Sequence, residues 1–373
     1  MMDFATKAIH LGHELEKSTG AVSPPIYLTT TFEREADGSY PRGYIYSRLS
    51  NPNRDALEKC LAGLENGESA AAFSSGLAAI MTLLQALKPG DHVLSSTDLY
   101  HGTVHMLKDI FVPWGLQVTF VDMTDTAAVE AGIKENTKLV FLETPSNPTL
   151  KITDIAAVSA IAHRAGAVCA CDNTWATPVL QRPLELGADL VIHSTSKYFG
   201  GHSDVLGGAL VSKHDDEFFQ RIRMIQRIGG AVPAPFDCWL VLRGTQTIHC
   251  RVMNQSESAS KIASFLEQHP QVEKVYYPGL SSHQGHEIAA RQMSGFGSML
   301  SFQVHGGKEK ALELTGKLRI ISRATSLGGV ESLIEHRASI EGPGSFTPDN
   351  LLRFSVGLEN VDDLIADLEQ ALI

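Results

Sequence analysis

The stretch AVCACDNTWATPVLQRPLELGADLVIHSTSKYFGGHSD, residues 167–204, holds two short apolar runs, Ala167–Ala170 and Asp189–Ile192, each followed by polar residues. Short apolar runs without polar alternation are typical of strands that are buried on both faces of a sheet. The polar residues after each run lie where a strand leaves the sheet. This stretch therefore predicts two buried strands with polar loops at their carboxyl ends.

The same rhythm extends in both directions along the chain. Further apolar runs of strand length are Ala70–Phe73, Asp91–Ser95, Gln117–Val121, Lys138–Leu142 and Gly208–Val211. Helical patterns lie between or just after these runs, at Leu77–Leu87, Ile155–Arg164 and Phe218–Arg227. Buried strands that alternate with helices predict a doubly wound α/β domain with a largely parallel sheet.

Both ends of the chain depart from this rhythm. Residues 1–52 are rich in Gly, Pro, Thr and Tyr and lack a clean period, which indicates an extended N-terminal arm. From residue 245 a long helix pattern reaches residue 268, followed by strands near Val275–Tyr277, Ser298–Val304 and Leu352–Val356 and by helices near Lys308–Leu318 and Val361–Leu372. We therefore expect an arm over 1–52, an α/β domain over 53–244 and a smaller α+β domain over 245–373.

The composition is that of a soluble globular protein, with 43% hydrophobic and 20% charged residues. The formal charge of −11 argues against nucleic acid or an anionic membrane as partner, because both need a basic face. Met1–His10 lacks a secretory signal pattern, and no apolar run approaches the ~20 residues that span a bilayer. Five scattered cysteines suit a reducing compartment, so we expect a cytoplasmic protein. Cys169 and Cys171 would share one face of a strand, where core packing is favoured over a metal or redox role.

Ligands of open α/β sheets bind beyond the carboxyl ends of the strands. Ser75 and Gly76 follow the first strand and enter a helix whose free N–H groups suit a phosphate, although Ser-Ser-Gly is also an ordinary helix cap. Tyr100 follows the second strand, where it would lie flat on an aromatic ligand or pack on the sheet edge. Asn147, in a turn after the fourth strand, offers an amide.

Two ionisable residues follow the fifth and sixth strands. Asp172 ends a buried strand, which is costly for a carboxylate unless a partner such as a protonated ring nitrogen is present; a helix-capping role is the alternative. Lys197 is surrounded by hydroxyls and glycines, and desolvation there would lower its pKa and make it a Schiff-base nucleophile. Ser194 and Ser196 are spaced to donate hydroxyls to a phosphate nearby.

With these motifs in this order, the chain resembles the trans-sulfuration (Cys/Met metabolism) family of fold-type-I enzymes that use pyridoxal 5′-phosphate (PLP). The resemblance covers essentially the whole chain, from YIYSRLSNP (44–52) through the strand-end motifs to SLGGVES (326–332) and LRFSVG (352–357). It implies an aspartate aminotransferase-like fold, with a mostly parallel sheet domain and a smaller C-terminal α+β domain.

The resemblance also implies roles for the candidate residues. Lys197 would bind PLP as a Schiff base and move protons, Asp172 would keep the pyridine nitrogen protonated, and Tyr100 would stack on the ring and act in acid–base chemistry. The other implied cofactor ligands are Ser75, Gly76, Leu77, Thr174, Ser194 and Ser196. The implied ligands of the substrate α-carboxylate are Asn147, Ser326 and Arg353, with Arg353 as the bidentate partner. A solvated charge on an edge strand is the alternative for Arg353.

By the same resemblance, Tyr46 and Arg48 reach the phosphate of a neighbouring subunit. A site that needs a neighbour's arm cannot work in a monomer, so a homotetramer built from intimate dimers is expected.

Three positions depart from the family pattern. Gly102 lies where methionine γ-lyases typically carry cysteine, which disfavours that activity. Thr325 lies where cystathionine γ-synthases and γ-lyases often carry a glutamate for the distal amino group of cystathionine, unless Glu331 or Glu335 supplies that charge. Ser196 stands where threonine is commoner, and either residue offers a hydroxyl.

The sequence therefore predicts a PLP-dependent carbon–sulfur lyase of the trans-sulfuration pathway, which eliminates a thiol from cystathionine or a related sulfur amino acid. The alternative is cystathionine γ-synthase, which makes a γ-replacement on an acylated homoserine with cysteine, because both reactions share their early steps and anchors. A PLP-binding protein without catalysis is disfavoured by the intact Lys197, Asp172, Tyr100 and Arg353. A dinucleotide-binding domain is disfavoured because no Gly-x-Gly-x-x-Gly follows the first strand.

Overall fold

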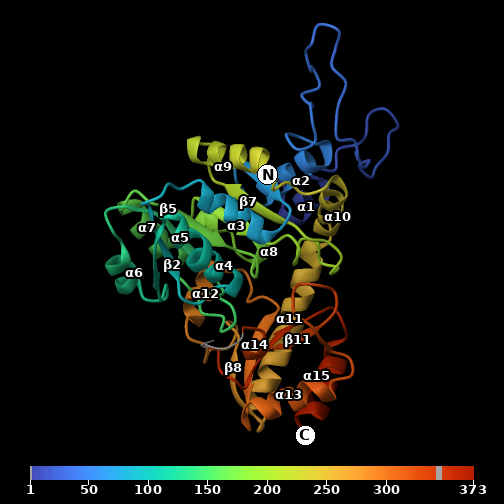
Figure 1. Ribbon diagram of the computed structural model, residues 1–373. Helices are drawn as coiled ribbons and strands as arrows, with labels where there is room; N and C mark the ends of the chain where they lie inside the picture. The colour runs from blue at the N-terminus through green and yellow to red at the C-terminus, as the bar shows by residue number, and fades with distance from the viewer. Residues whose placement is uncertain (1, 342–346) are drawn as a thin grey trace.

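The computed structural model describes residues 2–341 and 347–373, which form two sheets with helices packed on them (Figure 1). The larger sheet has the strand order β1-β7-β6-β5-β4-β2-β3. Its strands are β1 (Ser69–Phe73), β2 (His92–Ser96), β3 (Gln117–Val121), β4 (Thr137–Glu143), β5 (Val168–Asp172), β6 (Leu190–His193) and β7 (Gly208–Ser212). β7 is antiparallel to both of its neighbours and the other pairs are parallel, so the predicted largely parallel sheet is confirmed.

Helices cover both faces of this sheet. They are α2 (Pro52–Glu65), α3 (Gly76–Gln85), α4 (His101–His105), the π-helix η1 (Met106–Phe111), α5 (Val112–Trp114), α6 (Thr126–Gly132), α7 (Ile155–Arg164), α8 (Thr177–Leu180), the 3-10 helix η2 (Pro183–Leu186), α9 (Glu217–Gly229) and α10 (Pro235–Thr245). One face packs on α3, η1 and α9, and the other packs on α2, α7 and α10. Cys169 and Cys171 lie on the second face, in a hydrophobic cluster with Val140 and Leu142, as expected for packing residues.

The smaller sheet has the order β10-β11-β12-β9-β8. Its strands are β8 (Val272–Tyr276), β9 (Met299–Val304), β10 (Ser322–Arg323), β11 (Leu333–His336) and β12 (Leu351–Ser355), and its helices are α11 (Ile248–Gln268), α12 (His286–Gln292), α13 (Gly307–Lys317), α14 (Arg337–Glu341) and α15 (Val361–Leu372). β10 and β11 were not predicted, because both are short and β11 carries the charged Glu335 in its middle. The antiparallel pairing of β11 with β12 sets Glu335 opposite Arg353.

The helix predicted from residue 245 begins later, because the chain turns between α10 and α11. The N–H groups of Gln246 and Thr247 bond to carbonyls three residues back, which tightens and ends α10. Arg251 then donates to the carbonyl of Gly244 and to the hydroxyl of Thr247, so its side chain supports the turn.

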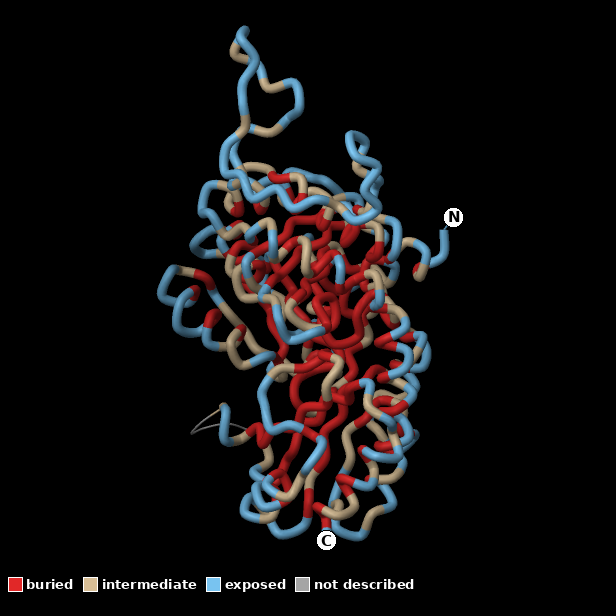
Figure 2. The backbone as a smooth tube through the Cα atoms, turned by 90° about the vertical axis from the view of Figure 1, so that its right-hand side faces the viewer, coloured by how far each residue is buried: buried red, intermediate tan, exposed pale blue. Residues whose placement is uncertain are grey.

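The predicted arm has two parts. Helix α1 (Phe4–His10) packs its Phe4 and Ala8 into the core, although no helical pattern was apparent there. Most of the segment between α1 and α2 has neither helix nor strand apart from a bridge between Thr31 and Tyr46, and it extends away from the body as an exposed loop (Figure 2).

Candidate active site

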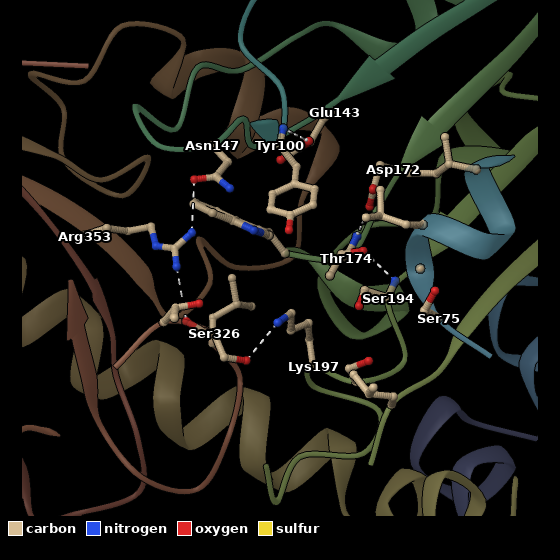
Figure 3. A pocket seen from close by; sticks show the side chains of 18 of the residues that line it. Ser75, Tyr100, Glu143, Asn147, Asp172, Thr174, Ser194, Lys197, Ser326 and Arg353 are labelled. Atoms are coloured by element: carbon tan, nitrogen blue, oxygen red, sulfur yellow. Dashed lines mark hydrogen bonds between the residues drawn. The ribbon is translucent and has the colours of Figure 1, made fainter. Parts of the chain in front are cut away.

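One cavity gathers the residues that follow the strands of the larger sheet and those of β12 and the loop before β11 (Figure 3). Every predicted site residue lines it except Tyr46 and Arg48. The predicted residues on its wall are Ser75, Gly76, Leu77, Tyr100, Asn147, Asp172, Thr174, Ser194, Ser196, Lys197, Ser326 and Arg353. Side chains that are far apart in the sequence therefore face the same space.

The start of α3 forms one end of the cavity. Ser75 caps this helix, with its Oγ accepting from Ala78 N at 3.0 Å, so the earlier N–H groups of Gly76 and Leu77 remain for a ligand. A side chain on Gly76 would place its Cβ 2.9 Å from Cβ of Ser194, and only glycine permits this close approach. This end of the cavity offers the unpaired donors that a phosphate needs.

The two serines near Lys197 are in different situations. Ser194 is held in place by its backbone N–H, which donates to Thr174 Oγ1 at 2.9 Å. The hydroxyl of Ser196 accepts from Gly207 N at 2.9 Å and lies 3.2 Å from the carbonyl oxygen of Gly207. Ser196 thus pins the loop at Gly207, and its predicted contact with a phosphate stays a prediction.

Asp172 and Glu143 end adjacent strands and are paired in register between β4 and β5. Burial raises the pKa of Asp172, while the hydrogen bond from Thr174 N to its Oδ1 (3.0 Å) opposes that effect. Burial and the charge of Asp172 raise the pKa of Glu143 well above its ordinary value. Burial and the charge of Asp172 therefore favour the neutral form of Glu143.

Lys197 Nζ donates to Ser326 Oγ at 2.8 Å. Burial, and then the positive charge of Arg353, lowers its pKa to about 8. Ser326 has a φ of +94°, a strained conformation for a residue with a side chain, and this directs its hydroxyl to Lys197. A lysine with so low a pKa is partly neutral near neutral pH, and the neutral amine is the nucleophilic form.

Arg353 is 5% exposed and is held from several sides. Its Nη1 donates to Asn147 Oδ1 at 3.1 Å, and its Nη2 donates to Ser326 O at 3.3 Å and to Glu335 Oε2 at 2.6 Å. Its guanidinium also lies over the ring of Trp175, 5.9 Å from the centroid. This is a buried, oriented cation on the cavity wall, not a solvated charge on an edge strand.

Tyr100 is 40% exposed and is anchored through its backbone, whose N–H donates to Glu143 Oε2 at 2.9 Å. A Cβ on Gly102 would lie 2.6 Å from Cε1 of the Tyr100 ring. The missing side chain at Gly102 therefore makes room for the position of this ring.

Tyr46 and Arg48 lie elsewhere, on the exposed loop before α2. Arg48 Nη1 donates to Arg227 O at 2.7 Å, and its guanidinium lies 5.7 Å from the centre of the Tyr46 ring. They do not enter the cavity of their own chain, and their predicted role in a neighbouring subunit stays a prediction.

The sequence did not single out three polar or aromatic residues of the cavity wall: Glu143, Trp175 and Arg337. Glu143 and Trp175 belong to strand-end segments that were noted, so the rule that found Asp172 could have found them. Arg337 follows β11, which was not predicted.

Glu331 and Glu335, which could supply the negative charge that Thr325 lacks, both have partners of their own. Glu335 is bonded to two guanidinium groups, those of Arg353 and Arg337, at 2.6 Å each. Glu331 accepts a hydrogen bond from Ser203. Thr325 itself lines the cavity.

Comparisons with known proteins all point to the same enzyme family. The model of the family described as Cys/Met metabolism PLP-dependent enzyme matches residues 5–373. Cystathionine γ-synthase of Mycobacterium tuberculosis is 49% identical, covering 99% of this chain and 96% of that protein. Cystathionine γ-lyase of Bacillus subtilis is 44% identical, covering 98% of each. The crystal structure of metB from Corynebacterium glutamicum has a TM-score of 0.97 and 44% identity, and it covers 100% of this chain and 98% of that one.

The cavity residues fit PLP. The start of α3 offers N–H donors for the phosphate beside a glycine that a Cβ would obstruct. Burial raises the pKa of the Asp172 carboxyl, and a protonated pyridine nitrogen is a cation that would offset the cost of its charged form. Lys197 supplies an amine of lowered pKa for the aldehyde.

Proposed function

Because the chain belongs to the Cys/Met metabolism family of PLP-dependent enzymes, we propose that it is a carbon–sulfur lyase that releases a thiol from cystathionine or a related sulfur amino acid. One observation carries the amino-acid substrate and the base in this proposal: Ser326 contacts both Lys197, through its hydroxyl, and Arg353, through its carbonyl oxygen. An amino acid whose α-carboxylate binds Arg353 therefore presents its α-carbon to the amine of Lys197.

In this arrangement the chain binds, orients and moves protons. Arg353 and Asn147 hold the α-carboxylate, and the guanidinium lies over the ring of Trp175. The neutral amine of Lys197 takes the α-proton and returns protons to carbon. When bound, PLP supplies an electron sink for the negative charge that forms at carbon, and Asp172 favours this by stabilising a protonated pyridine nitrogen.

Cystathionine γ-synthase is the second candidate. It is favoured by the relatives, since γ-synthases named in mycobacteria are 47–49% identical to this chain and the named γ-lyases are 44% identical. Replacement needs the same carboxylate anchor and the same base, followed by addition of cysteine to the γ-carbon. The geometry described above serves either reaction.

Product analysis separates these candidates. Purified enzyme is incubated with cystathionine, with cysteine, and with O-acylhomoserine plus cysteine. A γ-lyase converts cystathionine and water into cysteine, 2-oxobutanoate and ammonia, whereas a β-lyase forms homocysteine, pyruvate and ammonia. A γ-synthase forms cystathionine and the free carboxylic acid from the ester. Efficient formation of cystathionine with little 2-oxo acid from any substrate would overturn the lyase proposal in favour of the synthase.

We also propose that the enzyme is a cytoplasmic homotetramer whose arm completes a neighbour's site. Tyr46 and Arg48 are exposed and lie in the segment before α2, where a second subunit can reach them. In the described part of the chain, no helix combines the length and apolar character needed to cross a membrane. Measurement of the solution mass tests the tetramer.

A further inference from the structure

Arg337 is a cation on the cavity wall, and the proposed function assigns it no role. It begins α14 directly after β11, and it is 3% exposed. Its Nη1 donates to Glu335 Oε1 at 2.6 Å, and its Nε and Nη2 donate to Glu341 Oε1 at 3.2 and 2.8 Å. A guanidinium has five N–H donors. Among the described residues, these three bonds leave two donors of Arg337 for a ligand.

Arg337 lies between the carboxylate anchor and the part of the wall that carries Tyr100. Glu335 joins it to Arg353 on one side. On the other side, burial, then His105 and then Arg337 lower the pKa of His101, whose ring stands edge-on to Tyr100 at 5.6 Å. Arg337 thus lines the same cavity as Arg353 and is joined to it through Glu335.

The charges around Arg337 are paired with one another. Arg353 and Arg337 are balanced by Glu335 and Glu341, and both glutamates are held by guanidinium groups. Thr325 is neutral, and burial and the charge of Asp172 raise the pKa of Glu143, which favours its neutral form. A carboxylate that approaches this wall therefore meets donors without an unpaired negative side chain among the residues described here.

Resting on the proposed function, we propose that Arg337 binds a carboxylate at the far end of the substrate side chain. It is then a specificity-determining residue, which selects amino acids whose γ-substituent ends in a carboxylate over those whose γ-substituent is neutral.

A matched pair of substrates tests this proposal: O-succinylhomoserine and O-butanoylhomoserine, which have the same chain length and differ in the terminal carboxylate. The observable is the ratio of their kcat/KM values, measured with cysteine present and followed by release of the acid and by formation of 2-oxobutanoate. The test variant is Arg337→Gln combined with Glu341→Gln, which removes the guanidinium and keeps the local charge balanced. Arg337→Lys retains the charge and loses the planar fork.

The wild-type enzyme should prefer the succinyl ester, and the double variant should lose about tenfold to hundredfold of that preference, the range for one charge-assisted contact. Arg337→Lys should lie between them. A variant that slows both esters equally, or unfolds at lower temperature with an unchanged ratio, would show that Arg337 is structural and overturn the inference. A wild-type enzyme that uses neither ester nor any thioether amino acid would instead overturn the proposed function.

Discussion

The lowered pKa of Lys197 predicts how fast the protein captures its cofactor at different pH values. At a pKa of about 8, roughly a quarter of the amine is neutral at about pH 7.5, whereas a lysine with the ordinary pKa of 10.5 would be neutral in about one molecule per thousand. The reacting species is therefore about 200 times more abundant than in an unperturbed lysine. Attachment of PLP should follow this titration, since only the neutral amine adds to an aldehyde.

The assay begins with enzyme stripped of cofactor by hydroxylamine. PLP is added over a range from about pH 6.5 to about pH 9.5, and the growth of visible absorption gives the attachment rate. Pyridoxamine 5′-phosphate, which has no aldehyde, controls for simple binding and is followed by tryptophan fluorescence. Arg353→Gln should raise the midpoint, because it removes a positive neighbour that lowers the pKa of Lys197. A rate that is flat with pH, or that rises without a midpoint throughout the range, would refute the reasoning.

Three further perturbations test other parts of the site. Asp172→Asn should lower kcat by at least about a hundredfold with little change in melting temperature, because an amide cannot stabilise a cationic ring nitrogen, and a loss within about threefold would contradict that pairing. Mixing inactive Arg48→Ala chains with inactive Lys197→Ala chains should restore some activity after subunit exchange, since one hybrid site receives both intact residues; no recovery despite proven exchange would mean that the arm serves its own chain. The pKa of Glu143 in the folded protein lies above its ordinary 4.5, so the contribution of Glu143 to stability is complete below pH 4.5 and is lost as the pH rises through the folded-state pKa. Glu143→Gln should therefore flatten the decline of melting temperature with pH. If wild type and variant show parallel plots of melting temperature against pH, Glu143 is not neutral in the folded protein.

Much of the site could be predicted because its residues follow strands directly. Asp172 and Lys197 are local features of the sequence, each just after a buried apolar run. A parallel sheet brings such strand ends to one edge whatever the details of packing. Glu143 obeys the same rule, because it is the last residue of β4.

The electrostatic arrangement around Arg353 could not be predicted in this way. Glu335 is 18 residues away in the sequence, and it faces Arg353 only because β11 and β12 pair in one register. A shift of that pairing by one residue would turn these side chains to opposite faces. Arg337 reaches the cavity only through the same short strand.

The sequence by itself determined the alternation of strands and helices, the order of the polar residues at the strand ends and the family resemblance, because each is written in neighbouring residues. Only the tertiary structure decided which charges meet. It showed that Glu335 is shared between two arginines, that the charge of Arg353 acts on Lys197, and that Arg337 lines the cavity. The physical reason is that burial and ion pairing depend on distances across the fold, and these are set when the two sheets close around one space.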